Sequence, residues 1–159
     1  MLGRNLVYRP AEDKDAPKMA EVLCGSIREL CVQDHGGDER RLQEWLANKT
    51  DDSVRLWLKN TANVLLVAEL DGEIAAVGGM QRHGHVILNY VAPAFRFRGI
   101  SKGMMVELER RALQLGIGAL TLESTVTAHR FYVGLGYRDM GEPGAKFGLR
   151  NYPMSKLIR

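Results

Sequence analysis

The stretch Arg96-Phe97-Arg98-Gly99-Ile100-Ser101-Lys102-Gly103-Met104 decides the fold, because it joins a predicted strand to a predicted helix. Residues 86–91 before it form an apolar run that predicts a buried strand, which Pro93 ends. After it, apolar residues recur at helical spacing as far as Leu115, so a helix is expected from about Ser101. The stretch is therefore a tight crossover with two glycines and three cations.

This crossover has the features of a phosphate site. Glycines allow a sharp turn with successive N–H groups facing one point, and a helix N-terminus adds partial positive charge. Arg96, Arg98 and Lys102 add full charges, which favours a phosphate and, better, a pyrophosphate. A solvated basic turn capped by Ser101, with Gly99 serving the backbone alone, is the alternative. The glycine spacing matches neither a P-loop nor the dinucleotide fingerprint.

Composition limits the remaining possibilities. The 159 residues, 45% of them hydrophobic, predict a single domain over 1–159 with its own core. Net charge is +3 without a long run of like charges, so a nucleic-acid partner is not expected. There is no apolar run of membrane-spanning length and no signal-peptide pattern in residues 1–10. We therefore expect a cytoplasmic protein without a membrane partner.

The two cysteines support the same compartment. Cys24 and Cys31 fall in one predicted helix, seven residues and thus roughly 10 Å apart. A disulfide needs Cα atoms within about 7 Å, so these two do not pair within that helix. No histidines stand at zinc-ligand spacing, so no metal site is expected, and Cys31 fits a buried structural thiol better than a nucleophile.

Periodicity predicts a mixed-sheet α/β domain with the element order β-ααα-βββ-α-β-α-ββ and at least one parallel crossover. Asp71-Gly72 predicts a two-residue hairpin turn, and Gly78-Gly79 predicts a bulge or a close backbone approach. The remainder after the strand that begins at Tyr137, through Gly144 and Gly148, is expected to be rich in loops until Pro153. Helices are expected after the capping residues Asp15, Asp38 and Thr50, near Ser101 and over 127–135, and strands over 5–9, 64–70, 73–80, 86–91, 119–123, from Tyr137 and over 153–158.

The order of elements and two motifs resemble the GNAT superfamily of acyl-CoA N-acyltransferases. Val91-Ala92-Pro93 followed by Arg96-Phe97-Arg98-Gly99-Ile100-Ser101 resembles one family signature, and residues 128–137 (Ala-His-Arg-Phe-Tyr-Val-Gly-Leu-Gly-Tyr) resemble a second. The likeness covers essentially the whole chain and implies a central mixed, mostly antiparallel sheet flanked by helices. Ser101 stands where the family usually has Gly or Ala, and Thr125 where it often has Asn or Ser.

The resemblance implies acetyl-CoA as co-substrate. Residues 97–102 would cradle its pyrophosphate, and the pantetheine arm would lie between the strand ending at Val91 and the strand 119–123, which splay apart. The backbone N–H groups of Asn89 and Val91 would polarise the thioester carbonyl, unless they simply pair in the sheet. The full set of implied cofactor-binding residues is Asn89, Tyr90, Val91, Arg96, Phe97, Arg98, Gly99, Ile100, Ser101, Lys102, Gly103, Thr125 and Ala128.

The same resemblance implies direct transfer of the acetyl group to an amine. Tyr132 is the expected acid that protonates the departing thiolate; without the resemblance, a Phe-Tyr pair in a helix fits the core. Glu123, at a strand end, is the expected base, and an ordinary solvent-facing Glu is the alternative. His83 and His85 are rivals for that role, or simply part of a turn.

The polar end of the first helix is expected to choose the amine acceptor, a small molecule or a protein or peptide. Glu29 and Asp34 could hold a cation of the acceptor there and Arg28 a carboxylate, and His35 is the fourth expected substrate-binding residue. A solvated helix end is the alternative for each residue. A non-catalytic acyl-CoA sensor on the same fold is the second functional class, and Tyr132 and Glu123 argue against it. Dimers are common in the family, so a homodimer is one expected state.

Overall fold

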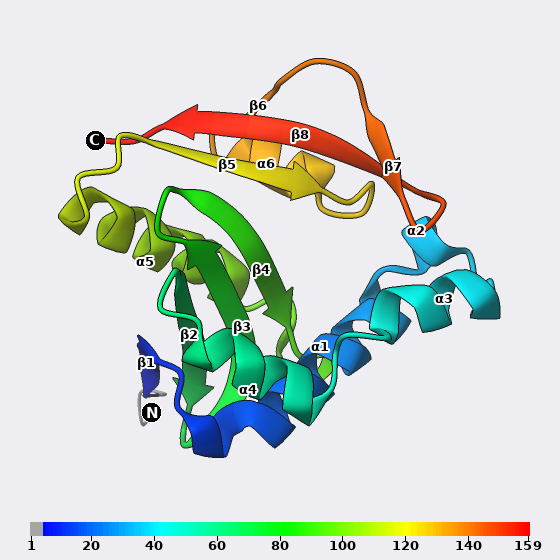
Figure 1. Cartoon of the computed structure of the whole chain (residues 1–159), viewed down its shortest axis with the longest axis horizontal. Helices are drawn as coiled ribbons and strands as arrows, with labels where there is room; N and C mark the ends of the chain where they lie inside the picture. Colours follow the sequence, from blue (N-terminus) through cyan, green and yellow to red (C-terminus); the bar gives the residue numbers. More distant parts are fainter. Residues whose placement is uncertain (1–4) are drawn as a thin grey trace.

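The computed structural model describes residues 5–159, and Figure 1 shows their course. The helical elements are η1 (Asp13–Asp15), α1 (Ala16–Leu30), α2 (Val32–His35), α3 (Glu39–Leu46), α4 (Asp51–Lys59), η2 (Pro93–Phe95), α5 (Ile100–Gln114) and α6 (His129–Gly134). The strands are β1 (Leu6–Pro10), β2 (Asn63–Leu70), β3 (Glu73–Gln81), β4 (His85–Val91), β5 (Ala119–Ser124), β6 (Arg138–Asp139), β7 (Gly144–Lys146) and β8 (Leu149–Leu157).

The strands form one sheet in the order β1-β2-β3-β4-β5-β8-β6, with β7 paired to β8. All pairs are antiparallel except β4 with β5. The predicted class, a mixed and mostly antiparallel sheet flanked by helices, is confirmed, and so is the parallel crossover through α5. The predicted hairpin turn at Asp71-Gly72 is also confirmed. Both residues have positive φ, 52° and 86°, as a two-residue hairpin turn requires.

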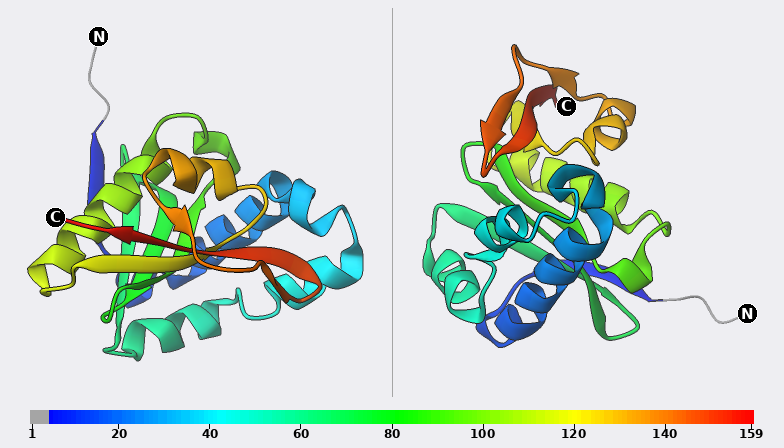
Figure 2. Two further views of the ribbon diagram at one scale, coloured as in Figure 1. Left: turned by 90° about the horizontal axis from the view of Figure 1, so that it is seen from above. Right: turned by 90° about the vertical axis from the view of Figure 1, so that its right-hand side faces the viewer.

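Helices cover both faces of the sheet (Figure 2). Met104, Met105 and Leu108 of α5 are buried against one face, together with Tyr132 of α6. On the other face, α1 and α4 pack against inward-facing residues of β2, β3 and β4. Side chains on opposite sides of one strand thus belong to two separate cores, as the alternation of a strand requires.

The pairing between β4 and β5 is short, and this opens the sheet. Only His85 with Thr121 and Val86 with Leu122 are in register. Directly after this pair the register of β4 against β3 shifts, so that Ile87 is an extra residue in β4. Such a bulge bends its strand and increases the local twist, so β4 leaves β5 at this point. The splaying predicted between these two strands is therefore present, and Figure 1 shows β5 and β8 diverging from β4.

Close packing fixes the start of α5 over the sheet. The Tyr8 hydroxyl on β1 donates a hydrogen bond of 2.9 Å to the Ile100 carbonyl. Gly103 makes this contact possible, because a Cβ there would lie 2.0 Å from the Tyr8 oxygen. Gly78 likewise lets α5 approach β3, since its Cβ would lie 2.4 Å from the Met104 sulfur. The close approach predicted at Gly78-Gly79 is thus confirmed, and the register shift adjoins it.

Several expected elements differ in detail. An extra helical turn, α2, follows α1, and residues 144–148 belong to a hairpin of β7 and β8 rather than to a loop. The last strand was expected from Pro153 but begins at Leu149. Pro153 lies inside β8, between the residues of β8 that pair with β7 and those that pair with β6. Proline donates no ladder hydrogen bond, which made it resemble the start of a strand in the sequence.

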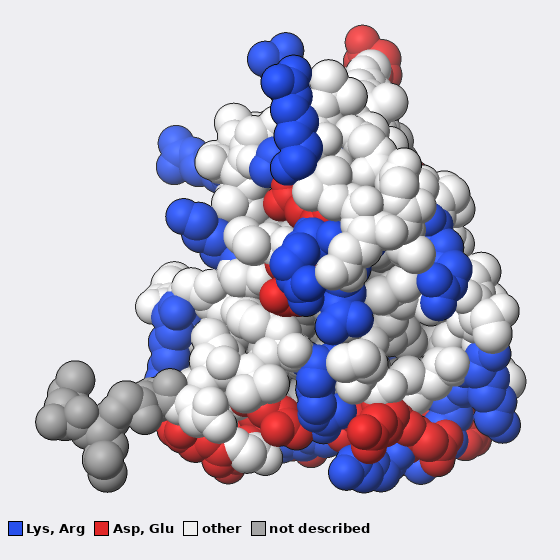
Figure 3. All heavy atoms as spheres, turned by 90° about the vertical axis from the view of Figure 1, so that its left-hand side faces the viewer, with Lys and Arg blue, Asp and Glu red and all other residues white. Residues whose placement is uncertain are grey.

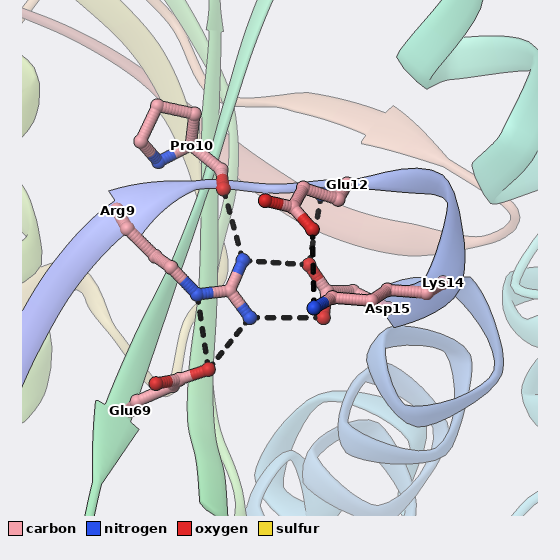
Figure 4. Close-up of polar contacts among 6 residues, drawn as sticks. All are labelled: Arg9, Pro10, Glu12, Lys14, Asp15 and Glu69. Carbon is pink, nitrogen blue, oxygen red and sulfur yellow. Dashed lines mark hydrogen bonds and ion pairs between the residues drawn. The ribbon is translucent and has the colours of Figure 1, made fainter. Parts of the chain in front are cut away.

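The Asp15 carboxylate does not cap α1, although Asp15 occupies the capping position. It accepts hydrogen bonds from Arg9 at 2.8 and 2.9 Å and from the Glu12 backbone N–H at 2.8 Å. Arg9 also bonds Glu69 of β2 at 2.6 Å, so one guanidinium ties β1, the start of α1 and β2 together (Figure 4). The Arg9 hydrogen bonds hold the pKa of Asp15 below its ordinary value, against the opposing effect of burial.

We expect Arg9→Met to lower the free energy of unfolding by about 3 kcal/mol at neutral pH, because it leaves the Asp15 side chain, only 6% exposed, without its cation. A lowered carboxyl pKa stabilises the fold above the unfolded-state pKa, and this contribution is lost as pH falls through the folded-state pKa. Urea unfolding at neutral pH and at about pH 3 should therefore show the difference shrinking at acid pH.

Arg40→Met is the matched control, because the ion pair that the exposed Arg40 forms within residues 5–159 is with Glu44 alone, at 3.6 Å. It should cost less than about 1 kcal/mol. Equal losses in the two variants at neutral pH would show that the Arg9 contacts contribute no more than a surface pair.

Charged side chains of both signs cover the face in Figure 3. Lys and Arg are dispersed over it, while Asp and Glu gather along its lower edge beside further cations. Within residues 5–159, no helix combines the length and the apolar character needed to cross a bilayer.

Candidate active site

Two cavities meet where β4 leaves β5. The larger, of about 320 Å³, opens toward α3, α4 and the β7–β8 hairpin, and we call it the acceptor cavity. The smaller, of about 190 Å³, runs between α1, α5 and α6, and we call it the thioester cavity. Both are lined by Val86–Leu88, Tyr90, Glu123 and Thr125, so these residues form the common wall.

The N-terminus of α5 lies at the end of the thioester cavity, where Ser101 lines it. Gly99 is the capping residue, with φ of 75°, and no side chain caps the helix. The first helical bond runs from the Gly103 N–H to the Gly99 carbonyl at 3.0 Å. The N–H groups of residues 100–102 therefore precede the helical ladder and are available to an anion. The alternative of a turn capped by Ser101 does not describe this geometry.

The crossover side chains are exposed around this helix end. The Arg98 guanidinium lies 5.4 Å from the centre of the Phe95 ring, and Arg96 lies 5.1 Å from that of Phe97. Phe97 is 93% exposed and has φ of 63°, an unusual conformation for a bulky residue. By contrast, Ile100 is buried in the core and Gly103 faces Tyr8, so these two offer only backbone atoms.

The edge of β4 presents unpaired donors to the gap. The Ala92 N–H donates to the Ala75 carbonyl of β3 at 2.8 Å. Neighbouring residues of a strand point their N–H groups to opposite sides, so those of Val91 and Asn89 point away from β3. No β5 residue is in register with either of them. They therefore face the thioester cavity, which both residues line.

Tyr132 of α6 also lines the thioester cavity, and the Asn89 side chain holds it. The Asn89 Nδ2 group donates to the Tyr132 hydroxyl oxygen at 3.3 Å, which leaves the hydroxyl hydrogen free for another acceptor. The Oδ1 atom of Asn89 is buried and has no hydrogen-bond partner within residues 5–159. A buried polar atom without a partner is uncommon in a native structure and points to a ligand contact.

Burial raises the pKa of Tyr132 to about 12, so the phenol keeps its proton at physiological pH. The Cys31 thiol lines the same cavity, and burial raises its pKa to about 12 as well. Cys31 is therefore protonated and a poor nucleophile.

Glu123, at the exposed edge of β5, contributes the only carboxylate among the residues that line the two cavities. His85 lines only the acceptor cavity, with its Nδ1 atom 2.8 Å from the Thr121 hydroxyl. Burial lowers the pKa of His85, while Glu123 opposes this shift, so the imidazole is neutral at pH 7. His83, the third candidate base, lines neither cavity.

The loop from β5 to α6 closes the other side of the gap. The Thr125 hydroxyl accepts a hydrogen bond of 3.1 Å from the Ala128 N–H, and both residues line the thioester cavity. Thr125 also lines the acceptor cavity. A hydroxyl at position 125 therefore performs a local structural role in fixing this loop.

Comparison with known families identifies the fold. The acetyltransferase (GNAT) domain model matches residues 31–158. The chain belongs to the GNAT acetyltransferase family. The resemblance seen in the two motifs is therefore confirmed, and with it the assignment of the protein as an acetyltransferase. No curated protein sequence matches this chain significantly.

Solved structures share the GNAT fold at low sequence identity. A GCN5-related N-acetyltransferase from Rhodopseudomonas palustris has a TM-score of 0.85 at 23% identity, over 99% of both chains. The PaiA N-acetyltransferase from Thermoplasma acidophilum, in complex with coenzyme A, has a TM-score of 0.79 at 17% identity, over 97% of this chain and 99% of that one. YncA from Salmonella typhimurium, solved with acetyl-CoA, has a TM-score of 0.65 at 18% identity, over 97% and 94%.

The residues expected to choose the acceptor lie outside both cavities. His35 is 3% exposed; its Nε2 faces the carbonyls of Ile27 and Arg28, and its Nδ1 accepts from the Gly37 N–H at 3.0 Å. This ring is therefore engaged in holding α2 to α1. Arg28 and Glu29 are exposed on α1.

Asp34 fixes the wide end of the gap. Its carboxylate accepts from the Val126 N–H at 2.7 Å, the Thr127 N–H at 3.2 Å and the Thr127 hydroxyl. The contact joins α2 to the β5–α6 loop across 92 residues of sequence. Asp34 thus ties α2 to the β5–α6 loop beside the thioester cavity, which Thr127 lines.

Sequence reasoning missed most of the acceptor cavity. Its walls combine α3, the following loop, α4 and the β7–β8 hairpin, which are distant in sequence. The residues concerned are Trp45, Asn48, Lys49, Trp57, Lys146, Phe147, Leu149, Arg150 and Asn151. The only local signal was the pair of glycines, Gly144 and Gly148, which also fits a loop.

Proposed function

We propose that this GNAT protein transfers the acetyl group of acetyl-CoA directly to a primary amine across the β4–β5 gap. The observation that carries the proposal is the junction of two cavities at one wall: unpaired donors and a protonated phenol line the thioester cavity, and the carboxylate of Glu123 belongs to the common wall. Coenzyme A would enter through the thioester cavity and the amine through the acceptor cavity. The uncapped start of α5 would hold the pyrophosphate.

In the reaction, the amine nitrogen bonds to the acetyl carbon and the carbon–sulfur bond breaks. The N–H groups of Asn89 and Val91 stabilise the oxygen anion of the tetrahedral intermediate, because fixed donors favour charge as it develops. The acceptor ammonium first loses a proton to Glu123, directly or through a water molecule. The departing thiolate gains a proton from Tyr132, which is regained from solvent in the next cycle.

Direct transfer is preferred over an acetyl-cysteine intermediate because Cys31 is buried and protonated. Asn89 has a dual part in this scheme. Its backbone faces the thioester, and its side chain orients the Tyr132 hydroxyl hydrogen away from itself, toward the cavity. A long acyl chain in place of acetyl would have to share the thioester cavity of about 190 Å³ with the pantetheine arm.

Variants of the crossover test the coenzyme A assignment. Arg98→Ala should weaken coenzyme A binding about 10-fold, the effect of one lost hydrogen bond to a charged group. Gly99→Val should weaken it further, because a β-branched residue is strained at φ of 75°. Calorimetric titrations with coenzyme A and with pantetheine would measure both effects.

Pantetheine lacks the pyrophosphate, so its affinity should be the same for wild type and Arg98→Ala. Arg110→Ala is the control, since Arg110 lies further along α5 and pairs with Glu107 at 2.8 Å. If both crossover variants bind coenzyme A as tightly as wild type does, the pyrophosphate does not bind at this site.

A further inference from the structure

The acceptor cavity carries an excess of positive charge. Three cations line it, Lys49, Lys146 and Arg150, against the single carboxylate of Glu123. None of the three cations forms an ion pair within the part of the chain that the structure describes, residues 5–159. Like charges gathered in one cavity repel, and this costs stability unless an anion binds among them.

Lys49 is the most confined of the three. Its ammonium donates to the Trp45 carbonyl at 3.3 Å and to the Asn48 side-chain oxygen at 2.5 Å. Both acceptors are neutral, and an ammonium has three N–H groups, so one remains for a ligand. Burial, with a further contribution from Lys146, lowers the pKa of Lys49 to about 8. The cavity thus holds an uncompensated cation.

The β7–β8 hairpin places the second cation at the cavity. Lys146 pairs with Leu149 across a two-residue turn, Phe147-Gly148, in which both residues have positive φ, 55° and 71°. Glycine adopts this conformation readily, whereas phenylalanine is strained in it. The Lys146 ammonium lies 5.5 Å from the centre of the Phe147 ring, and both residues line the cavity, as do Trp45 of α3 and Trp57 of α4.

The two signs of charge come from different parts of the wall. Glu123 belongs to the common wall at the gap, where the amine must reach the thioester. Lys49, Lys146 and Arg150 come from the α3–α4 loop and the hairpin, and none of them lines the thioester cavity. A ligand that satisfies both regions carries a primary ammonium group, which reaches Glu123, and an anionic group, which reaches the cations.

Resting on the proposed function, we propose that the acceptor is a small primary amine that also carries an anionic group, a carboxylate or a phosphate, on an apolar body. Amino acids with large side chains have this chemistry. The anionic group binds Lys49, Lys146 and Arg150, the apolar body lies among Trp45, Trp57 and Phe147, and the amine faces Glu123. A volume of about 320 Å³ suits one such molecule.

Matched pairs of amines test this proposal, with thiol release from saturating acetyl-CoA as the readout. Phenylalanine is compared with phenethylamine, tryptophan with tryptamine, and phosphoethanolamine with ethanolamine, so that each pair differs in the anionic group. We expect kcat/KM to be at least about 10-fold higher for the anionic member of the preferred pair, the effect of a charge-assisted hydrogen bond. A high ratio in the third pair would show that a phosphate is recognised even without an apolar body.

The Lys49→Gln and Lys146→Gln variants should bring this ratio toward one, and added salt should reduce it in wild type. Lys59→Gln is the control, because Lys59 is exposed at the end of α4 and lines neither cavity. Its ratio should equal that of wild type. If the neutral amines are acetylated with the same kcat/KM as their anionic partners, the proposal is overturned.

A binding measurement separates this proposal from the proposed function. In the presence of coenzyme A, N-acetylphenylalanine should bind at least about 10-fold more tightly than N-acetylphenethylamine. If neither phenylalanine nor phenethylamine is acetylated but N-acetylphenylalanine still binds more tightly, the anion site stands and the acetyl-transfer assignment fails. If the amines are acetylated but the two products bind equally, the enzyme stands and the anion site is refuted.

Discussion

Replacing Tyr132 with phenylalanine should lower kcat about 100-fold or more, the scale of general acid catalysis, while acetyl-CoA affinity hardly changes. The substitution keeps the ring, which is 7% exposed and packs edge-on against Phe131 and Tyr137. It removes only the hydroxyl that Asn89 positions. The loss is then confined to the transition state, where the sulfur acquires its charge.

Tyr137→Phe is a matched control. The Tyr137 hydroxyl is also buried, has no hydrogen-bond partner within residues 5–159, and lines neither cavity. Its removal should leave kcat unchanged. Single-turnover kinetics would establish that the chemical step is being compared. Equal turnover of Tyr132→Phe and wild type under these conditions would exclude Tyr132 as the acid.

The pH profile gives the same test a second form. Because burial raises the pKa of Tyr132 to about 12, the phenol stays protonated throughout an ordinary assay. No loss of rate between about pH 7 and pH 10 should therefore arise from its ionisation. If the rate of wild type falls between about pH 7 and pH 10 and the rate of Tyr132→Phe does not, the pKa of the Tyr132 phenol is lower than its burial implies.

Replacing Glu123 with glutamine should lower kcat/KM for the acceptor by about 100-fold near neutral pH, because the acceptor ammonium must lose a proton before it attacks. The loss should shrink as pH approaches the amine pKa of about 10, since more of the amine then arrives deprotonated. Initial rates of thiol release at several pH values would measure both effects.

His85→Gln is the comparison that decides between the two bases. His85 lines the same acceptor cavity and is neutral at pH 7, but it lies where β4 and β5 are still paired. We expect its loss of rate to be under about 10-fold. A larger loss of rate in His85→Gln than in Glu123→Gln would assign the role of base to His85 instead of Glu123.

The scaffold of the site could be predicted from sequence because its signals are local. A glycine before a helix, three cations around it and Pro93 after a strand are all within a dozen residues. The hairpin at Asp71-Gly72 is equally local. These features depend on backbone preferences that each residue carries with it, so the sequence shows them before any tertiary contact forms.

The acceptor side could not be predicted in this way, because it depends on contacts between distant segments. The polar residues near the end of α1 attracted attention, but Asp34 and His35 are engaged in joining α2 to other elements. The β7–β8 hairpin lacked a recognisable turn, since Phe147 is an unfavourable residue for positive φ. The link between Asn89 and Tyr132 spans 43 residues and left no local pattern.

A crystal structure of the complex with acetyl-CoA tests the central claim most directly. We expect the pyrophosphate on the N–H groups of residues 100–102, the thioester carbonyl facing Asn89 and Val91, and the sulfur within about 3.5 Å of the Tyr132 hydroxyl. An acetyl-CoA molecule bound outside the β4–β5 gap, or one whose sulfur lies beyond hydrogen-bonding reach of Tyr132, would contradict it.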